Sequence, residues 1–142
     1  MNWFYWALLS AVFAGATAVL AKIGVENVDS NLATAVRTTV VLVFAWGVVF
    51  ATRAAGALTA MAEMPRKTWL FLTLSGVATG LSWLCYFRAL QLGPASKVAP
   101  IDKLSVVFVL VFAASFLGEP LTWKTGLGGA LITAGAVVLA WK

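Results

Sequence analysis

Five apolar segments, each long enough to cross a lipid bilayer, constrain this chain more than any other feature. A transmembrane helix needs about 20 largely apolar residues. Segments of this length lie at 3–22, 32–52, 68–90, 98–117 and 123–141. Of the 142 residues 62% are hydrophobic and 11% are charged, whereas a soluble domain carries roughly 25% charged residues. The sequence therefore predicts an all-α, polytopic membrane protein with five transmembrane helices.

The links between these segments are too short to form a separate domain. The longest link, 53–67, has room for a short surface helix, and no internal repeat is visible. We therefore expect residues 1–142 to form a single transmembrane domain. The first segment has no basic residues before it and is long for the apolar core of a signal peptide, so we expect it to be a transmembrane helix.

The basic residues divide almost evenly between the two sides of the membrane. With five spans, the side of Met1 carries Arg53, Arg66, Lys67 and Lys124. The opposite side carries Lys22, Arg37, Arg88, Lys97, Lys103 and Lys142. Because a lysine and arginine bias sets membrane orientation, a small bias predicts weakly determined or dual topology. This role in topology also accounts for the net charge of +5 without nucleic acid.

One face of the third segment carries a stripe of hydroxyl groups. Its members are Ser75, Thr79, Ser82 and Tyr86, spaced by four, three and four residues, with Trp83 beside them. Such hydroxyls commonly bond to their own backbone or to a neighbouring helix. Four of them in register favour a water-facing substrate path.

Charged residues near one end of the spans are the other candidates for a substrate path. Lys22 and Arg88 lie at span ends, where long cationic side chains can extend to the headgroups. Arg37 and Lys103 lie about one turn deeper and are better candidates for contacting an anionic substrate, Asp102 or exposed carbonyl groups. Asp102 is the acid expected within the apolar zone at this end.

The segment around Asp102 combines helix breaks with charge. Pro94 breaks the preceding helix, and Pro100 is expected at the first helical position of the fourth span. Asp102 and Lys103 are adjacent, so they point about 100° apart on a helix and cannot share one face. We therefore expect Asp102 to face the cavity, with Arg37 as its cationic partner.

Small residues on two spans predict close helix packing. Gly76 and Gly80 form a GxxxG pair on the third span. The fifth span carries a similar face, formed by Gly126, Gly129, Ala130 and Thr133. This face could contact a neighbouring helix of the same chain or a second subunit. We expect a homodimer to which the fifth span contributes.

Several classes of function are excluded by what the sequence lacks. It has no histidine, and Cys85 is its lone cysteine. Its apolar segments also have no carboxylate pair at helical spacing, and the sequence has no glycine-rich phosphate loop, so we expect neither an enzyme nor a metal or cofactor site. Trp46 lies near the middle of the second span, where it either packs or lines an apolar substrate pocket.

The C-terminal half resembles a known family. Its residues Ala89-Leu90, Pro94-Ala95-Ser96, Val98-Ala99-Pro100 and Phe116-Leu117-Gly118-Glu119 are similar to the recurring pattern of the EamA-like family of the drug/metabolite transporter superfamily. Lys22 at the end of the first span and Arg37 early in the second also fit this pattern. The Asp102-Lys103 pair differs from it, since the family commonly has apolar residues there.

The resemblance implies a function and an assembly. Typical members have ten spans, built from two five-span units in inverted orientation, and this chain is one such unit. It implies a secondary transporter that moves small metabolites across a bacterial or archaeal inner membrane by alternating access, with the site between two units. The alternative is a non-transporting membrane scaffold, or an accessory subunit that pairs with a related chain.

Overall fold

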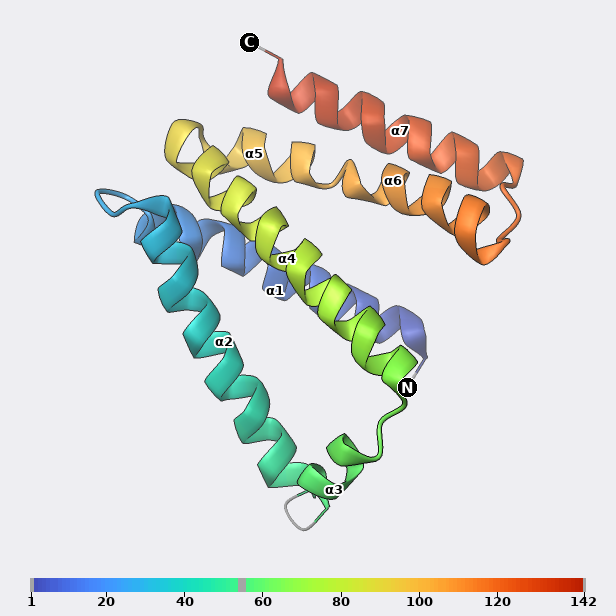
Figure 1. The fold of residues 1–142 in the computed structure, drawn as a ribbon. Helices are drawn as coiled ribbons and strands as arrows, with labels where there is room; N and C mark the ends of the chain where they lie inside the picture. Colours follow the sequence, from blue (N-terminus) through green and yellow to red (C-terminus); the bar gives the residue numbers. More distant parts are fainter. Residues whose placement is uncertain (1, 54–55, 142) are drawn as a thin grey trace. The chain divides into compact units, whose positions relative to one another are not determined.

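A computed structural model describes residues 2–53 and 56–141, and its regular elements are all helical. They are α1 (Trp3–Gly24), α2 (Ser30–Arg53), α3 (Ala57–Ala62), α4 (Arg66–Leu92), α5 (Ala95–Asp102), α6 (Ser105–Phe112), the π-helical turn η1 (Ala113–Leu117) and α7 (Trp123–Ala140) (Figure 1). The short helix α3 occupies the long link after α2, where the sequence left room for one.

Five helical stretches of the described residues are long and apolar enough to cross a membrane. They are Trp3–Gly24, Ser30–Thr52, Arg66–Leu92, Ala95–Leu117 and Trp123–Ala140. Most of their large apolar side chains are exposed, as lipid-facing side chains are. The prediction of an all-α membrane protein with five transmembrane helices is confirmed.

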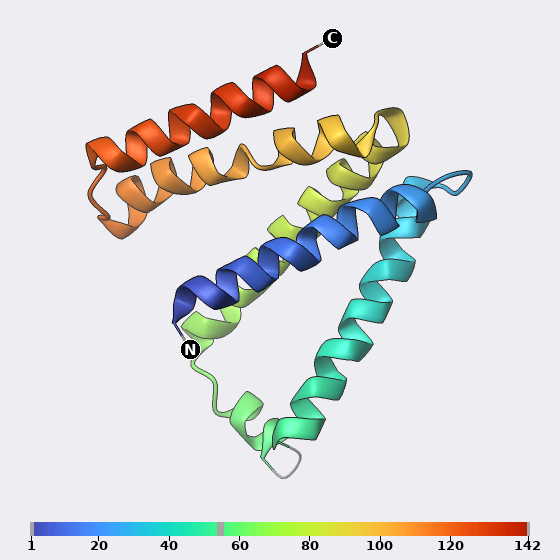
Figure 2. The same cartoon turned by 180° about the vertical axis from the view of Figure 1, so that it is seen from behind.

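The chain divides into two compact units. Unit 1 comprises the residues up to Ile23 and those from Ala89 onward, and unit 2 comprises Gly24–Arg88. In unit 1, α7 runs alongside α5 and α6 in the opposite direction, as both views show (Figures 1 and 2). In unit 2, α3 connects α2 to α4.

The fourth span is broken into two helices, which the sequence analysis did not predict. Pro94 is extended, with φ −70° and ψ 141°, and α5 begins directly after it. Pro100 therefore lies inside α5, so its expected place at the first helical position is wrong. Since proline has no N–H to donate, it weakens the helix around it, and α5 ends only two residues later at Asp102.

The hydrogen bonds at this break change from the α-helical pattern to a tighter one. The N–H groups of Leu104, Val106 and Val107 donate to the carbonyl groups three residues earlier, at 3.0, 3.1 and 2.9 Å. Such three-residue steps are typical of a 3₁₀ turn rather than an α-helix. Residues 103–104 therefore form a joint between α5 and α6 within one span.

The end of the same span is also irregular. After the π-helical turn, Gly118 adopts a positive φ of 68°, a conformation that glycine reaches without a side-chain clash. The N–H of Glu119 donates to the carbonyl oxygen of Ala113 at 3.2 Å, which closes the helix end. Thr122 and Thr125 then form a capping box that starts α7.

Candidate functional site

The residues proposed from the sequence divide between the two units. Unit 2 holds Arg37, Trp46, Ser75, Thr79, Ser82, Trp83 and Tyr86. Unit 1 holds Lys22, Asp102 and Lys103. The contacts of these residues are therefore described within each unit separately.

Arg37 of α2 lies against two aromatic rings of α4. Its guanidinium carbon is 4.2 Å from the centroid of the Trp83 ring and 5.5 Å from that of Phe87. Both distances are within the range of a cation–π interaction. Trp83 and Phe87 are four residues apart on a helix, so they share one face and present their rings together. The structure thus joins two residues that the sequence analysis had proposed separately.

The hydroxyl stripe of α4 continues from this cluster along the helix. Ser75, Thr79 and Ser82 are exposed, and Tyr86 is half-buried beside Phe87. The Thr79 hydroxyl donates to the backbone carbonyl of Ser75 at 2.9 Å. This bond satisfies the Thr79 donor within its own helix, yet its oxygen can still accept a hydrogen bond. The position of the Thr79 hydroxyl is therefore compatible with both expected roles, a bond to its own backbone and a place on a water-facing substrate path.

The glycine pair of α4 has no packing partner within unit 2. A Cβ atom built on Gly76 or Gly80 would meet no other atom within 4 Å. The expectation that these glycines pack closely against another helix is thus not met inside this unit. Their face is open to lipid or to a partner.

We expect cysteine accessibility to distinguish the two faces of α4. Cysteines placed singly at Ser75, Thr79 and Ser82, after replacement of Cys85, should react with a water-soluble maleimide in membranes. Cysteines at Gly76 and Gly80 should react at least about tenfold more slowly, because a thiol covered by lipid or protein is rarely a thiolate. Faster labelling at the two glycine positions would assign the water-facing side to the opposite face.

Trp46 lies apart from the arginine cluster. Its ring stacks on Phe50, one turn further along α2, with centroids 5.7 Å apart and planes inclined by 29°. It follows Arg37 by nine residues, which is about 13 Å along a helix. The described contacts of Trp46 are therefore those of a packing residue within α2.

Lys22 closes the C-terminal end of another helix. Its ammonium group donates to the carbonyl oxygens of Leu90 and Gly93, at 2.6 and 3.1 Å. The last carbonyl groups of a helix lack intrahelical donors and carry a partial negative charge, so a lysine ammonium is stabilised there. Lys97 does the same for α7, with its ammonium group 3.1 Å from the carbonyl oxygen of Trp141. Lys22 therefore has a helix-capping role that the sequence analysis did not anticipate.

Asp102 and Lys103 form an ion pair with each other. The Lys103 ammonium lies 3.3 Å from a carboxylate oxygen of Asp102, and both side chains are partly exposed. α5 ends at Asp102, and Lys103 begins the joint. That Asp102 faces a cavity stays a prediction. A bond between Asp102 and Arg37 remains a prediction.

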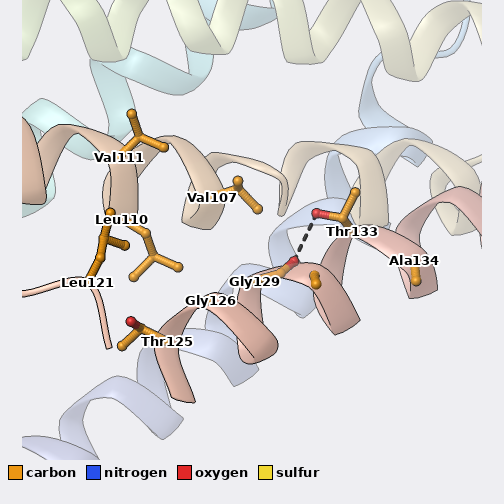
Figure 3. A pocket seen from close by; sticks show the side chains of 10 residues that line it. Val107, Leu110, Val111, Leu121, Thr125, Gly126, Gly129, Thr133 and Ala134 are labelled. Carbon is orange, nitrogen blue, oxygen red and sulfur yellow. Dashed lines mark hydrogen bonds between the residues drawn. The ribbon is translucent and has the colours of Figure 1, made fainter. Parts of the chain in front are cut away.

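A pocket of about 470 Å³ lies between the second half of the fourth span and α7 (Figure 3). Val107, Leu110 and Val111 line it from α6, opposite small residues of α7 that include Gly126 and Gly129. Thr133 points its hydroxyl at the Gly129 carbonyl, at 2.9 Å, so the lining is almost wholly apolar. A Cβ on Gly129 would come within 3.2 Å of Leu110, so this glycine packs against a helix of its own chain.

Five apolar helices long enough to span a bilayer define the class of this protein, an integral membrane protein. The chain belongs to the EamA-like transporter family, whose model matches residues 1–141.

Curated relatives agree with this assignment. An uncharacterized transporter in the cobO 3' region of Sinorhizobium sp is 54% identical over 139 residues, covering 98% of this chain and 96% of that protein. The probable 4-amino-4-deoxy-L-arabinose-phosphoundecaprenol flippase subunit ArnE of Enterobacter sp. (strain 638) is 31% identical, covering 52% of this chain and 69% of its own. The corresponding subunit ArnF of Klebsiella pneumoniae is 36% identical, covering 54% and 61%. No solved structure matches the chain.

Two contact residues were missed at the sequence level. Phe87 was overlooked because it lies beside the hydroxyl stripe, although its spacing of four from Trp83 could have indicated a shared face. Lys97 was assigned to topology alone. Its position one turn after Pro94 carried no signal for the end of α7, which lies more than 40 residues further along the chain.

Proposed function

We propose that this chain is one five-helix unit of a secondary transporter, which moves small metabolites or related solutes across a membrane by alternating access as a dimer. The observation that carries the proposal is a cationic side chain, Arg37, held inside a span on the rings of Trp83 and Phe87. Charged residues within spans are rare and mark substrate or ion pathways. Family membership over nearly the whole chain supports the same function.

The dimer follows from the general plan of such transporters. Two repeats of opposite orientation commonly enclose a site near the middle of the membrane. A single five-span unit supplies one repeat, so a second copy would supply the other. The bacterial relatives support a bacterial cytoplasmic membrane as the location.

The second candidate is a subunit that pairs with a related chain. Two relatives are named as subunits of a flippase for a lipid-linked amino sugar. If this chain resembles them in assembly, its partner would be a similar five-span protein rather than a second copy. A lipid-linked sugar phosphate then becomes one candidate substrate alongside water-soluble metabolites.

Binding and transport assays on the purified protein distinguish these two functions. Thermal-shift screening against a metabolite panel should identify stabilising compounds, and proteoliposomes containing this chain alone should then transport them. Stabilisation followed by transport supports a homodimeric transporter. Transport that requires co-reconstitution with a related chain supports the subunit. If no compound moves under either condition, the transporter proposal fails.

Assembly can be tested at the middle of α7. Leu131 is exposed and lies halfway along α7. In a parallel or an antiparallel dimer, the two copies of this residue therefore lie at the same depth in the membrane. A cysteine there, in a chain lacking Cys85, should give an oxidised dimer in membranes. A cysteine at buried Gly129, which faces Leu110, should not. Monomer alone at both positions would contradict a homodimer formed through α7.

Orientation is the last part of this proposal. The nearly even division of basic residues motivates dual topology, with an antiparallel pair as the working form. Reporter fusions to the C-terminus should therefore show both locations in one population of cells. Adding two lysines to the 53–67 link should shift the population toward one location. A single location in the unmodified chain would exclude dual topology and leave a parallel dimer.

A further inference from the structure

The charged groups near one end of the spans differ in what neutralises them. The ammonium groups of Lys22 and Lys97 bond to helix-end carbonyls, and Lys103 pairs with Asp102. Arg88 also has an interaction within the structure. Within unit 2, the described contacts of the Arg37 guanidinium are those with the rings of Trp83 and Phe87. Its positive charge thus has no anionic partner among the described residues of that unit.

The acids of unit 2 are engaged or distant along the chain. A carboxylate oxygen of Asp29 accepts the N–H groups of Asn31 and Leu32, at 2.9 and 3.0 Å, where α2 begins. Glu26 lies in the link before α2, and Glu63 follows α3, beyond the far end of α2. Unit 2 therefore provides the arginine with rings and no carboxylate.

The position of Arg37 within the span makes this arrangement unusual. Arg37 follows Ser30, the first residue of α2, by seven residues, which is about 10 Å along a helix. A long side chain at this depth can extend to the headgroups. Instead its guanidinium lies closer to Trp83 than to Phe87, and Trp83 is the residue further from the end of α4. The rings therefore hold the charge inside the span.

We propose that Arg37, held by Trp83 and Phe87, docks the oxyanion of the substrate, a phosphate or carboxylate group. This inference rests on the proposed transport function and specifies its substrate class. A guanidinium has five N–H donors in a planar fork that matches these anions. The aromatic rings provide no strong hydrogen-bond acceptors, so these donors are available to the substrate. The rings position the fork.

A cationic substrate fits this site poorly. An organic cation would be recognised by the face of an aromatic ring. Arg37 already occupies the Trp83 ring at 4.2 Å, so a second cation would approach a like charge. The same arrangement therefore attracts an anion and repels a cation.

Three probes test the docking group on the purified full-length chain in a neutral detergent. They are inorganic phosphate, dodecyl phosphate and dodecyltrimethylammonium. We expect at least one phosphate probe to raise the midpoint of thermal unfolding by about 5 °C at saturation, and the cation to give no rise. A response to inorganic phosphate indicates a water-soluble substrate, and a response to dodecyl phosphate alone indicates a lipid headgroup.

Three variants assign the response to this site. Arg37→Gln should lose it, and Arg37→Lys should retain part of it. The control Lys67→Gln removes an exposed positive charge at the start of α4 and should keep the full response. A response that survives in Arg37→Gln, a cation that stabilises equally, or no response to either phosphate overturns the proposal.

A fluorescence measurement covers the case in which Arg37→Gln does not fold. The active phosphate probe should change the tryptophan emission of the unmodified chain, and Trp83→Phe should lose that change. An emission change that is the same in both proteins overturns the assignment to this cluster. Transport is read separately in proteoliposomes: anion binding without transport would refute the proposed function alone, and transport of cations alone would refute the docking group.

Discussion

Lys22→Met should lower the midpoint of thermal unfolding by about 5–10 °C. Lys22 donates to the carbonyls of Leu90 and Gly93, so the variant leaves two acceptors at the end of α4 without this donor. Hydrogen bonds to a charged group contribute about 1.5–3 kcal/mol, and the favourable charge at a helix C-terminus adds about 0.3–1 kcal/mol. For a chain of this size each kcal/mol corresponds to roughly 2–4 °C. Leu90 is fully buried, so water replaces the lost donor poorly.

Two matched substitutions determine whether this loss is specific. Lys124→Met removes an exposed lysine at the start of α7 and should change the midpoint by less than about 1 °C. Lys97→Met should have an intermediate effect, because one of its two carbonyl contacts, to Ala140, is long at 3.5 Å. Equal midpoints for Lys22→Met and Lys124→Met would contradict a capping role and return Lys22 to the candidates for substrate contact.

The five helices could be predicted because apolar length alone determines them. A span must be about 20 residues long to cross the bilayer and must satisfy its backbone groups internally. Both requirements are local, so they can be read from consecutive residues. The short helix α3 was within reach for the same reason, since the link that contains it was too polar to cross and long enough to fold.

The break in the fourth span could not be predicted from the same information. A proline such as Pro100 is accepted in the first turn of a helix, and it can also lie in the interior of a helix that it weakens. The neighbouring residues do not decide between these two positions. Once α5 began at Ala95, Pro100 lay within it and the helix ended at Asp102. Asp102 is therefore the last residue of α5, and Lys103 belongs to the joint that follows it.

The candidate site was predicted as a set of residue types and not as a set of contacts. Arg37 and Trp83 were both named as candidates, but their contact joins two residues separated by more than 40 positions in the sequence. Periodicity reports which residues share a face of one helix and contains no information about which helix faces it. For Lys22 the partners were backbone carbonyls, which have no sequence signature at all.

The charge pair at the joint between α5 and α6 leads to the second large effect. Asp102→Asn should reduce transport by about tenfold or more at matched protein levels, while the protein still folds and inserts. The substitution removes a carboxylate at the break within a span, and such broken helices form transport sites. Lys103→Gln should be milder, because the Lys103 side chain is 56% exposed and that of Asp102 is 34% exposed.

The double variant Asp102→Asn with Lys103→Gln separates two roles of the carboxylate. If Asp102 serves only to neutralise Lys103 within the span, removing both charges leaves no unpaired ion and should restore transport. If the carboxylate itself contacts a substrate or a proton along the path, the double variant should remain as slow as Asp102→Asn alone. We expect the second result, because irregular backbone within a span is tolerated where it lines a cavity, and such broken helices form transport sites. The measurement is uptake into proteoliposomes that contain each of the three variants at matched protein levels. Near-normal transport by Asp102→Asn would limit this residue to a structural or topological role.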